Sequence, residues 1–358
     1  MSDTLGTLRE IRPARVCLIK PSSLGDVVHA LPVLSALRRL WPDATIAWVI
    51  NRSLVGLIEG HPDLDLVLPF DRARINPSPR GMARMATFLI DLRRQRFDLT
   101  IDLQGLFRSG LMAWATGASV KVGLAEAREG ATRFYTHRVD TGGVKVHAVD
   151  RLLRIAEVFG ADITSPRFDV PISVEDRRWA RETLRPLVGP RLVLNVGARW
   201  LTKRWPPAHF AAVARRAAAE QGASLIAVGA PEDRPLVDEL LANLAPLPCL
   251  DLGGATTIPR LAAIAAEADL FLSNDTGPLH LAAATGTRVV GIYTCTHPER
   301  TGPYGPNAVT ARSCVWCAPS YIKTCDRLDC MTELTPDRVW PAVAYQLAAA
   351  RAMGHSAA

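Results

Sequence analysis

Apolar runs of strand length alternate with segments of helical period along nearly the whole chain. Met85, Phe88, Leu89 and Leu92, for example, have the three- and four-residue spacing of one helix face. Continuous apolar runs between such segments are typical of a parallel sheet covered by helices on both faces. In the first half they predict strands at residues 16–20, 45–50, 66–70, 99–103 and 120–123, and helices at 27–40, 84–94 and 108–115.

The second half of the chain restarts the same alternation after a Pro- and charge-rich stretch, residues 164–190, that holds one helix. We therefore predict an α/β fold of two doubly wound, Rossmann-like domains that face each other across a cleft. The expected parts are an N-terminal domain (1–170), a linker (171–190), a C-terminal domain (191–335) and a final helical segment (336–358) that packs back on the N-terminal domain. The second-half strands are predicted at 192–196, 224–228, 249–252, 270–273 and 288–293, and the helices at 207–221, 235–244, 258–267 and 279–284.

Composition and charge narrow the class of protein. The 358 residues are 48% hydrophobic and 22% charged, which is ordinary for a globular chain of two domains. No stretch reaches the ~20 apolar residues of a membrane span, and no secretory signal begins the chain, so we expect a cytoplasmic protein. The net charge of +7 comes mainly from scattered arginines. This favours acidic small molecules or a phosphorylated membrane surface as partners over nucleic acid.

Ligands of doubly wound sheets bind at the carboxyl ends of the strands, so the strand-to-helix loops are the candidate sites. The first loop, KPSSLGDVVHALPVL, places Asp26 in the first turn of a helix. A carboxylate there is either a general base or an ordinary first-turn acid that the helix dipole favours. The loop lacks the glycines of G-x-G-x-x-G, which argues against dinucleotide binding.

Two further features of the first half carry polar groups. The loop DLQGLFRSG offers Gln104 and Arg108 for hydroxyls or an anion, although helix capping and surface solvation explain them equally well. A Pro-broken loop nearby is either a solvated face or a docking surface for an anionic acceptor or lipid headgroup. Its arginines are Arg72, Arg74, Arg80 and Arg84.

The second half contributes two more loops. In NVGARWLTKRWPPAHF, Lys203 lies just before a predicted helix N-terminus, where free N–H groups favour phosphate. In SNDTGPLHLAAATG, the strand ends at Asp275, and the amides of Thr276 and Gly277 are expected to point toward a ligand. His280 lies one turn into the helix. Because these polar residues gather at a strand tip, we favour a functional site over a structural one.

Four of these motifs, in this order, resemble a known family. SSLGDVVHALPVL, DLQGLFRSG, KRWPPAHF and NDTGPLHLAAATGTRVVGIYTCTHPERTGPYG together resemble family 9 glycosyltransferases, the lipopolysaccharide heptosyltransferases. The stretches EAREGATRFYTHRV and VHAVDRLLRI further resemble the heptosyltransferase I branch. The resemblance spans residues 20–305 and implies the GT-B fold, with the acceptor in the N-terminal domain and an ADP-sugar in the C-terminal domain.

The resemblance also implies roles for matching residues. Asp26 matches the proposed general base of an inverting displacement on the anomeric carbon, and Lys203 matches a lysine that contacts the donor phosphates. Heptosyltransferase I proteins carry a Thr-Thr pair where this chain has Ala198 and Arg199, so the identity of the donor is open. The implied donor-binding residues are Arg199, Lys203, Asp275, Thr276, Gly277 and His280, and the implied acceptor-binding residues are Ser22, Ser23, Gly25, Gln104, Arg108 and Arg128.

Two places in the sequence have residue types and spacings found in metal sites. Asp63 and Asp65 form a D-x-D, a metal-binding spacing in other glycosyltransferases, but they precede a strand, so we interpret them as turn residues and expect no required cofactor. Four cysteines with the spacing C-x2-C-x7-C-x4-C either hold a structural zinc, remain free thiols or include a redox pair. They are Cys314, Cys317, Cys325 and Cys330.

The leading hypothesis is a cytoplasmic enzyme, peripheral on the inner membrane, that transfers heptose from ADP-heptose to an anionic glycolipid of the lipopolysaccharide inner core. It requires no transmembrane segment and no nucleic acid. One competing hypothesis is a family 9 transferase with another donor or acceptor. A second is a sugar-nucleotide or glycolipid binding protein without catalysis, and a dehydrogenase is disfavoured by the missing glycine fingerprint.

Overall fold

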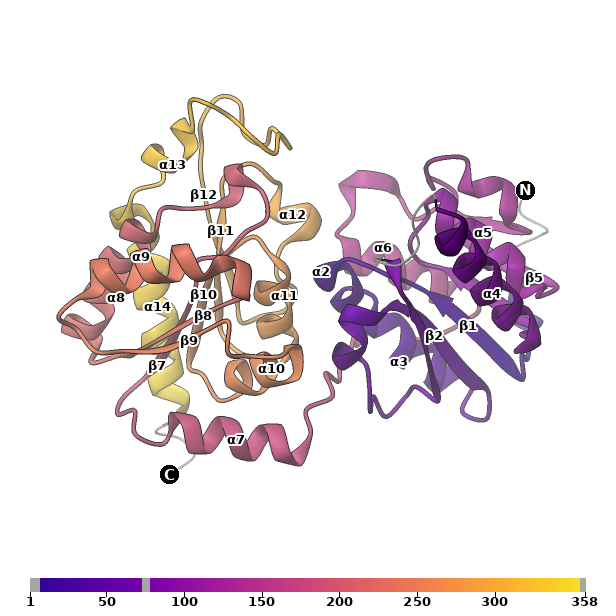
Figure 1. Cartoon of the computed structure of the whole chain (residues 1–358), viewed down its shortest axis with the longest axis horizontal. Coiled ribbons are helices and arrows are strands. Elements are labelled where there is room, and N and C mark those ends of the chain that lie inside the picture. The colour runs from indigo at the N-terminus through magenta and orange to yellow at the C-terminus, as the bar shows by residue number, and fades with distance from the viewer. Residues whose placement is uncertain (1–6, 73–77, 355–358) are drawn as a thin grey trace. The chain divides into compact units, whose positions relative to one another are not determined.

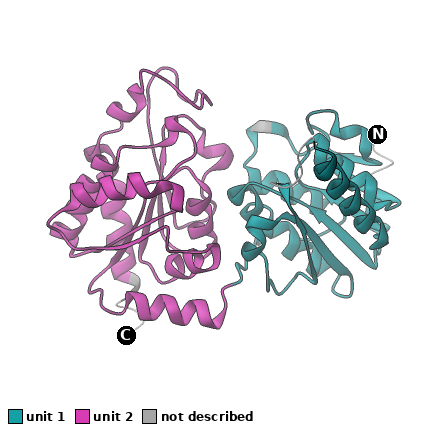
Figure 2. Ribbon diagram, viewed as in Figure 1, with its two compact units in different colours: residues 1–171 teal, residues 172–358 magenta. Residues whose placement is uncertain are grey.

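The computed structural model describes residues 7–72 and 78–354, and its chain divides into two compact units, Met1–Pro171 and Ile172–Ala358 (Figure 2). Each unit contains one six-stranded parallel sheet with helices packed on it (Figure 1). Both sheets have the same strand order. In the first unit it is β3-β2-β1-β4-β5-β6, and in the second it is β12-β11-β10-β7-β8-β9. Counted from the first strand of each unit, both orders are 3-2-1-4-5-6. This is the doubly wound order, in which the second and third strands extend the sheet on one side of the first strand and the later strands extend it on the other side.

The first unit confirms the five predicted strands and adds a sixth, β6, at the sheet edge. Its core includes Cys17 and Ile19 from one strand and Ala47 and Val49 from the next, which explains the continuous apolar runs. The strands are β1 Arg15–Ile19, β2 Thr45–Asn51, β3 Leu66–Phe70, β4 Leu99–Asp102, β5 Val120–Leu124 and β6 His137–Val139. The helices are η1 Thr7–Glu10, α2 Leu24–Val28, α3 Leu31–Leu40, η2 Arg52–Leu57, α4 Pro79–Arg94, α5 Phe107–Thr116, η4 Ala131–Phe134, η5 Gly143–Lys145 and α6 Ala148–Glu157.

The predicted single helix at residues 27–40 was wrong, because the structure has two helices there. Helix α2 ends at Val28 and α3 begins at Leu31. Pro32 has no N–H group to donate to the carbonyl of Val28, so a continuous α-helical hydrogen-bond pattern is interrupted at this point. The short helix α2 therefore carries Asp26 separately from the long buried helix α3.

The second unit confirms the other five strands and adds β12 at the edge. Leu192 and Leu194 of β7 enter one core with α8, α9 and α14, while Val193 enters another with α7, α10 and α11. The strands are β7 Arg191–Asn195, β8 Ser224–Gly229, β9 Cys249–Gly253, β10 Leu270–Asn274, β11 Val289–Tyr293 and β12 Ala308–Arg312. The helices are α7 Val174–Leu184, η6 Leu201–Lys203, α8 Pro207–Gln221, η7 Pro231–Asp233, α9 Arg234–Leu244, α10 Ile258–Ala266, α11 Gly277–Ala284, α12 Pro298–Thr301, α13 Asp329–Glu333 and α14 Pro336–Gly354.

The last helix belongs to the core of the second unit. Helix α14 packs against α8 and the strands β10, β11 and β12, with Val339, Val343 and Leu347 fully buried in that core. Among the residues described, no helix is both long and apolar enough to cross a membrane.

Candidate active site

The carboxyl end of β1 in the first unit holds a buried lysine close to two carboxylates. Lys20 is only 6% exposed, and its Nζ donates to the carbonyl of Leu103 at 3.0 Å. Burial lowers the pKa of Lys20, and the negative charges of Asp26 and Asp102 act in the opposite direction. The charge of Lys20 favours the ionised form of Asp26, whereas burial raises the pKa of Asp102.

Asp26 lies in the first turn of α2 and is partly buried. Ser23 donates to Asp26 Oδ2 twice, from its backbone N–H at 3.0 Å and from its hydroxyl at 2.6 Å. Burial raises the pKa of Asp26, but Lys20, the two Ser23 hydrogen bonds and His29 together bring it below its usual value. The carboxylate is therefore ionised at neutral pH. Because both Ser23 bonds end on Oδ2, Oδ1 lies outside this arrangement and is the oxygen suited to accept a proton.

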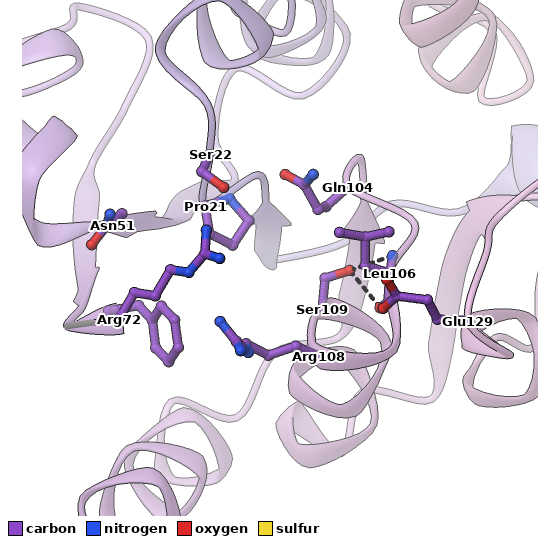
Figure 3. A pocket seen from close by; sticks show the side chains of 10 residues that line it. Pro21, Ser22, Asn51, Arg72, Gln104, Leu106, Arg108, Ser109 and Glu129 are labelled. Atoms are coloured by element: carbon purple, nitrogen blue, oxygen red, sulfur yellow. Dashed lines mark hydrogen bonds between the residues drawn. The ribbon is translucent and has the colours of Figure 1, made fainter. Parts of the chain in front are cut away.

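A pocket of about 180 Å³ lies in the first unit at the carboxyl ends of four neighbouring strands. Figure 3 shows Ser22, Gln104 and Arg108, three of the predicted acceptor residues, around this pocket. Two cations, Arg72 and Arg108, extend into it from the ends of β3 and α5. The pocket therefore combines positive charge with hydroxyl and amide groups, a composition that suits an anionic, hydroxyl-rich ligand.

Sequence reasoning missed two polar residues that line this pocket, Asn51 at the end of β2 and Glu129 after β5. It also missed Asp102, which is fully buried and holds the loop that contains Gln104 by accepting hydrogen bonds from it. Asp102 accepts the hydroxyl of Tyr135 at 2.6 Å and the N–H of Gln104 at 2.8 Å. The sequence offered one signal for Asp102, which is that an acidic residue ends a largely apolar strand.

The other predicted acceptor residues of the first unit do not line the pocket. Ser23 is exposed and serves Asp26, Gly25 is buried within α2, and Arg128 is exposed with its backbone N–H on the carbonyl of Gly105 at 2.8 Å. Arg74 of the predicted arginine cluster lies outside the described residues. The residues of this group that meet the pocket are therefore fewer than the sequence suggested.

The carboxyl end of β10 in the second unit brings three predicted donor residues together. Lys203 Nζ lies 2.5 Å from Asp275 Oδ2, and His280 Nε2 lies 3.6 Å from Asp275 Oδ1. Burial of Asp275 raises its pKa, but the hydrogen bond from His280 and the charge of Lys203 lower it well below the usual range. An ionised Asp275 holds the ammonium of Lys203 in a buried ion pair. A carboxylate itself repels phosphate.

The remaining predicted donor residues surround this pair. Thr276 is the N-cap of α11 and Gly277 is its first residue. The N–H groups of a first helical turn have no partner within the helix, and they carry the positive end of the helix dipole. Arg199 is exposed in the loop that follows β7. Lysine, helix N-terminus and arginine thus give this end of the sheet a positive character suited to a diphosphate.

Two buried asparagines and a threonine complete this site, and the sequence analysis did not identify them. Asn195 Nδ2 donates to Ser273 Oγ at 2.8 Å and to Thr276 Oγ1 at 3.2 Å. Asn274 joins the β7 and β10 loops, since it donates to Val196 O at 2.8 Å and accepts from the N–H of Trp205 at 3.1 Å. Thr296 donates to Asp275 Oδ2 at 2.5 Å. These bonds hold the loops rigidly at the tips of adjacent strands.

The structure does not support the zinc site. Among the described residues, no group of three or more His, Cys, Asp or Glu side chains has the arrangement of a metal site. Cys314 and Cys317 are exposed, whereas Cys330 is buried in the apolar core of the second unit. Burial raises the pKa of Cys330 to about 11. The cysteine spacing suggested zinc, but the described side chains do not form a group of metal ligands.

The D-x-D residues have structural contacts. Asp65 pairs with Arg38, and its carboxylate accepts the N–H of Ile46 at the start of β2 at 2.7 Å. The N–H of Asp63 donates to His61 Nδ1 at 3.1 Å. These contacts agree with turn and strand-entry residues.

The chain is similar to a known enzyme family over most of its length. The sequence profile of glycosyltransferase family 9 (heptosyltransferase) matches residues 85–331. Lipopolysaccharide heptosyltransferase 1 of Pseudomonas aeruginosa is 32% identical over 352 residues, which cover 91% of this chain and 96% of that protein.

Solved structures give the same result for the fold. A family 9 glycosyltransferase of Veillonella parvula aligns with a TM-score of 0.80 at 22% identity, covering 93% of this chain and 97% of that one. Escherichia coli heptosyltransferase WaaC with ADP aligns with a TM-score of 0.75 at 25% identity, covering 93% and 99%. Two doubly wound units of this kind are the GT-B architecture. The chain belongs to glycosyltransferase family 9, the heptosyltransferase family, and is a glycosyltransferase of GT-B fold.

Proposed function

We propose that this protein transfers heptose from ADP-heptose to a hydroxyl of the anionic lipopolysaccharide inner core, with Asp26 as the general base. The observation that carries this proposal is the complementary chemistry of the two units. One unit holds an ionised carboxylate, Asp26, on the loop whose Ser22 lines a polar pocket with two arginines. The other holds Lys203 beside the N-terminus of α11.

In the proposed reaction the first unit binds the acceptor and the second binds the donor. Asp26 Oδ1 removes the proton of the acceptor hydroxyl as its oxygen attacks the anomeric carbon. The bond from that carbon to the diphosphate oxygen breaks with inversion, and ADP leaves. Lys203 and the amides of Thr276 and Gly277 stabilise the charge that develops on the diphosphate. Because the diphosphate leaves as a stable anion, no second carboxylate is required as an acid.

The donor and acceptor are supported by different observations. Heptosyltransferase names among the relatives and a relative solved with ADP favour an ADP-sugar. Arg72 and Arg108 in the pocket favour an acceptor with carboxylate or phosphate groups. Arg199 stands where heptosyltransferase I proteins have threonine, and this is the feature that favours the alternative of another nucleotide sugar.

We also propose that the enzyme works peripherally at an anionic membrane surface. Ile90 of α4 and Trp114 of α5 are 53% and 59% exposed, and they line one depression with Arg93 and Lys121. Exposed apolar and aromatic side chains beside cations fit the headgroup region of an anionic bilayer. Binding of this surface to a membrane would bring the first unit, which contains the polar pocket, close to a lipid-linked acceptor.

The decisive experiment measures sugar transfer and donor binding with Asp26→Asn. We expect transfer from ADP-heptose to a Kdo–lipid A acceptor to fall at least about 100-fold, because the amide cannot take the proton. ADP binding measured by calorimetry should be unchanged. The control Asp91→Asn removes an exposed carboxylate of α4 and should leave both quantities unaltered.

The same assay separates the competing functions. Unchanged transfer in Asp26→Asn would refute Asp26 as the base. ADP binding by the wild type without transfer to any acceptor would favour a binding protein. Transfer from UDP- or GDP-sugars in place of ADP-heptose would keep the fold and the leaving group but replace the donor.

A further inference from the structure

The segment between β12 and α13, residues 313–328, carries three of the clustered cysteines and has no part in the proposed reaction. Most of it is exposed, with Trp316 84% and Ile322 53% accessible. Its middle part nevertheless contacts the loop that holds Lys203. We call residues 321–323 of this segment the Tyr-Ile-Lys tip.

Backbone hydrogen bonds fix the Tyr-Ile-Lys tip to the loops after β7 and β11. The N–H of Tyr321 donates to the carbonyl of Cys295 at 2.9 Å. Thr202 contacts the tip twice, since its hydroxyl donates to Ile322 O at 2.5 Å and its N–H donates to Lys323 O at 3.4 Å. Thr202 is 2% exposed and immediately precedes Lys203. The tip is thus held in place through the main chain, independently of its lysine side chain.

This docking places a second ammonium at the indole ring that the donor lysine contacts. Lys203 Nζ lies 4.8 Å from the centroid of the Trp200 ring, and Lys323 Nζ lies 5.6 Å from the same centroid. Both distances are within the range of a cation–π contact. The chain has only five lysines, so two of them at one indole ring concentrate a scarce residue type.

The charges of the two lysines are balanced differently. Lys203 is paired with the buried carboxylate of Asp275. Lys323 is exposed, and among the residues that the structure describes no carboxylate lies within ion-pair distance of it. Two ammonium groups at one ring repel each other unless an anion joins them. The site therefore has one more positive charge than its own carboxylate neutralises.

We propose that Lys323 is a further donor-binding residue, which contacts the diphosphate of the nucleotide sugar together with Lys203. This inference rests on the proposed function, because it takes Lys203 as a ligand of that diphosphate. Trp200 contacts both lysine side chains, and the main-chain position of the Tyr-Ile-Lys tip places the second lysine at this ring. The diphosphate spans the two ammonium groups and offsets their repulsion. The cysteine-bearing segment thereby becomes part of the donor site.

The test compares ADP with adenosine, which lacks the phosphates, by calorimetry on the full chain. We expect Lys323→Met to weaken ADP binding by about fivefold to tenfold, as for the loss of one exposed charge-assisted contact. Adenosine binding should be unchanged, the salt dependence of ADP binding should decrease, and Lys323→Arg should retain most of the affinity. Because the tip is held by main-chain bonds, Lys323→Met should unfold at the wild-type temperature.

Arg185→Met is the matched control. Arg185 is exposed at the end of α7 and precedes β7, so it lies toward the amino ends of the strands, opposite to the donor loops. Its loss should leave ADP binding unchanged. If the wild type binds ADP and Lys323→Met binds it equally well, the inference is overturned. An equal loss of ADP and adenosine binding would also overturn it, whereas a wild type that does not distinguish ADP from adenosine would refute the proposed function instead.

Discussion

Removing the ammonium of Lys203 is expected to damage the protein in two separable ways. In Lys203→Met, Asp275 keeps Thr296 and His280 but loses its closest cation, at 2.5 Å. The side chains of Lys203 and Asp275 are 18% and 5% exposed, so solvent compensates little for the loss. Breaking a buried pair by removing one partner costs about 3–5 kcal/mol. With two contacts to Asp275 retained, we expect a loss of about 2–3 kcal/mol in the free energy of unfolding of the second unit.

The double variant Lys203→Met/Asp275→Asn separates stability from function. Removing both charges leaves no uncompensated carboxylate, so stability should return to within about 1 kcal/mol of the wild type. ADP affinity should remain low, because the ammonium is absent in both variants. Urea unfolding gives the first quantity, and calorimetric titration with ADP gives the second. Wild-type stability in the single variant, or restored ADP binding in the double variant, would refute our account of this pair.

Three further outcomes follow from the structure. Ser23→Ala removes one hydrogen bond that lowers the pKa of Asp26, so the acidic limb of the pH–rate profile, where transfer falls as Asp26 becomes protonated, should move to higher pH. An acidic limb at the wild-type pH would show that Asp26 does not control the rate. Trp205 is fully buried and its Nε1 donates to Leu334 O at 2.7 Å, so Trp205→Ala should cost about 3–5 kcal/mol and Trp205→Phe less, measured by urea unfolding; equal costs would assign no role to the indole N–H. Ile90→Ser/Trp114→Ser should reduce cosedimentation with anionic vesicles several-fold while transfer to a short water-soluble acceptor persists, and unchanged cosedimentation would contradict the membrane surface.

The stability of the second unit in acid should depend on the protonation of Asp275. The pKa of Asp275 is lower in the folded chain than its usual value of 3.8. Its stabilising contribution is therefore complete above that value and is lost as the pH falls through the lowered pKa. Asp275 accordingly belongs to the groups whose protonation unfolds this unit in acid.

The strands and most helices were determined locally, and the sequence predicted them. A strand buried on both faces must be apolar at every position, so runs such as residues 270–273 are distinctive. The edge strands β6 and β12 were missed because each has only one buried residue, and their sequences resemble loops. The split between α2 and α3 was visible as Pro32, but the apolar period across it dominated our interpretation.

Only the tertiary structure decided which distant side chains meet. Loop position and residue type identified Lys203, Asp275 and His280 as candidates. They did not show that Asp275 holds the lysine, which is 72 positions away in the sequence. Lys20, Asn195 and Asn274 end apolar strands, and their roles follow from neighbours on adjacent strands. The cysteine spacing suggested zinc, yet Cys330 packs in the core and the segment instead places Lys323 beside Trp200. Short-range patterns determine secondary structure because its hydrogen bonds and apolar periods are local, whereas a site is a set of long-range contacts that the strand order creates.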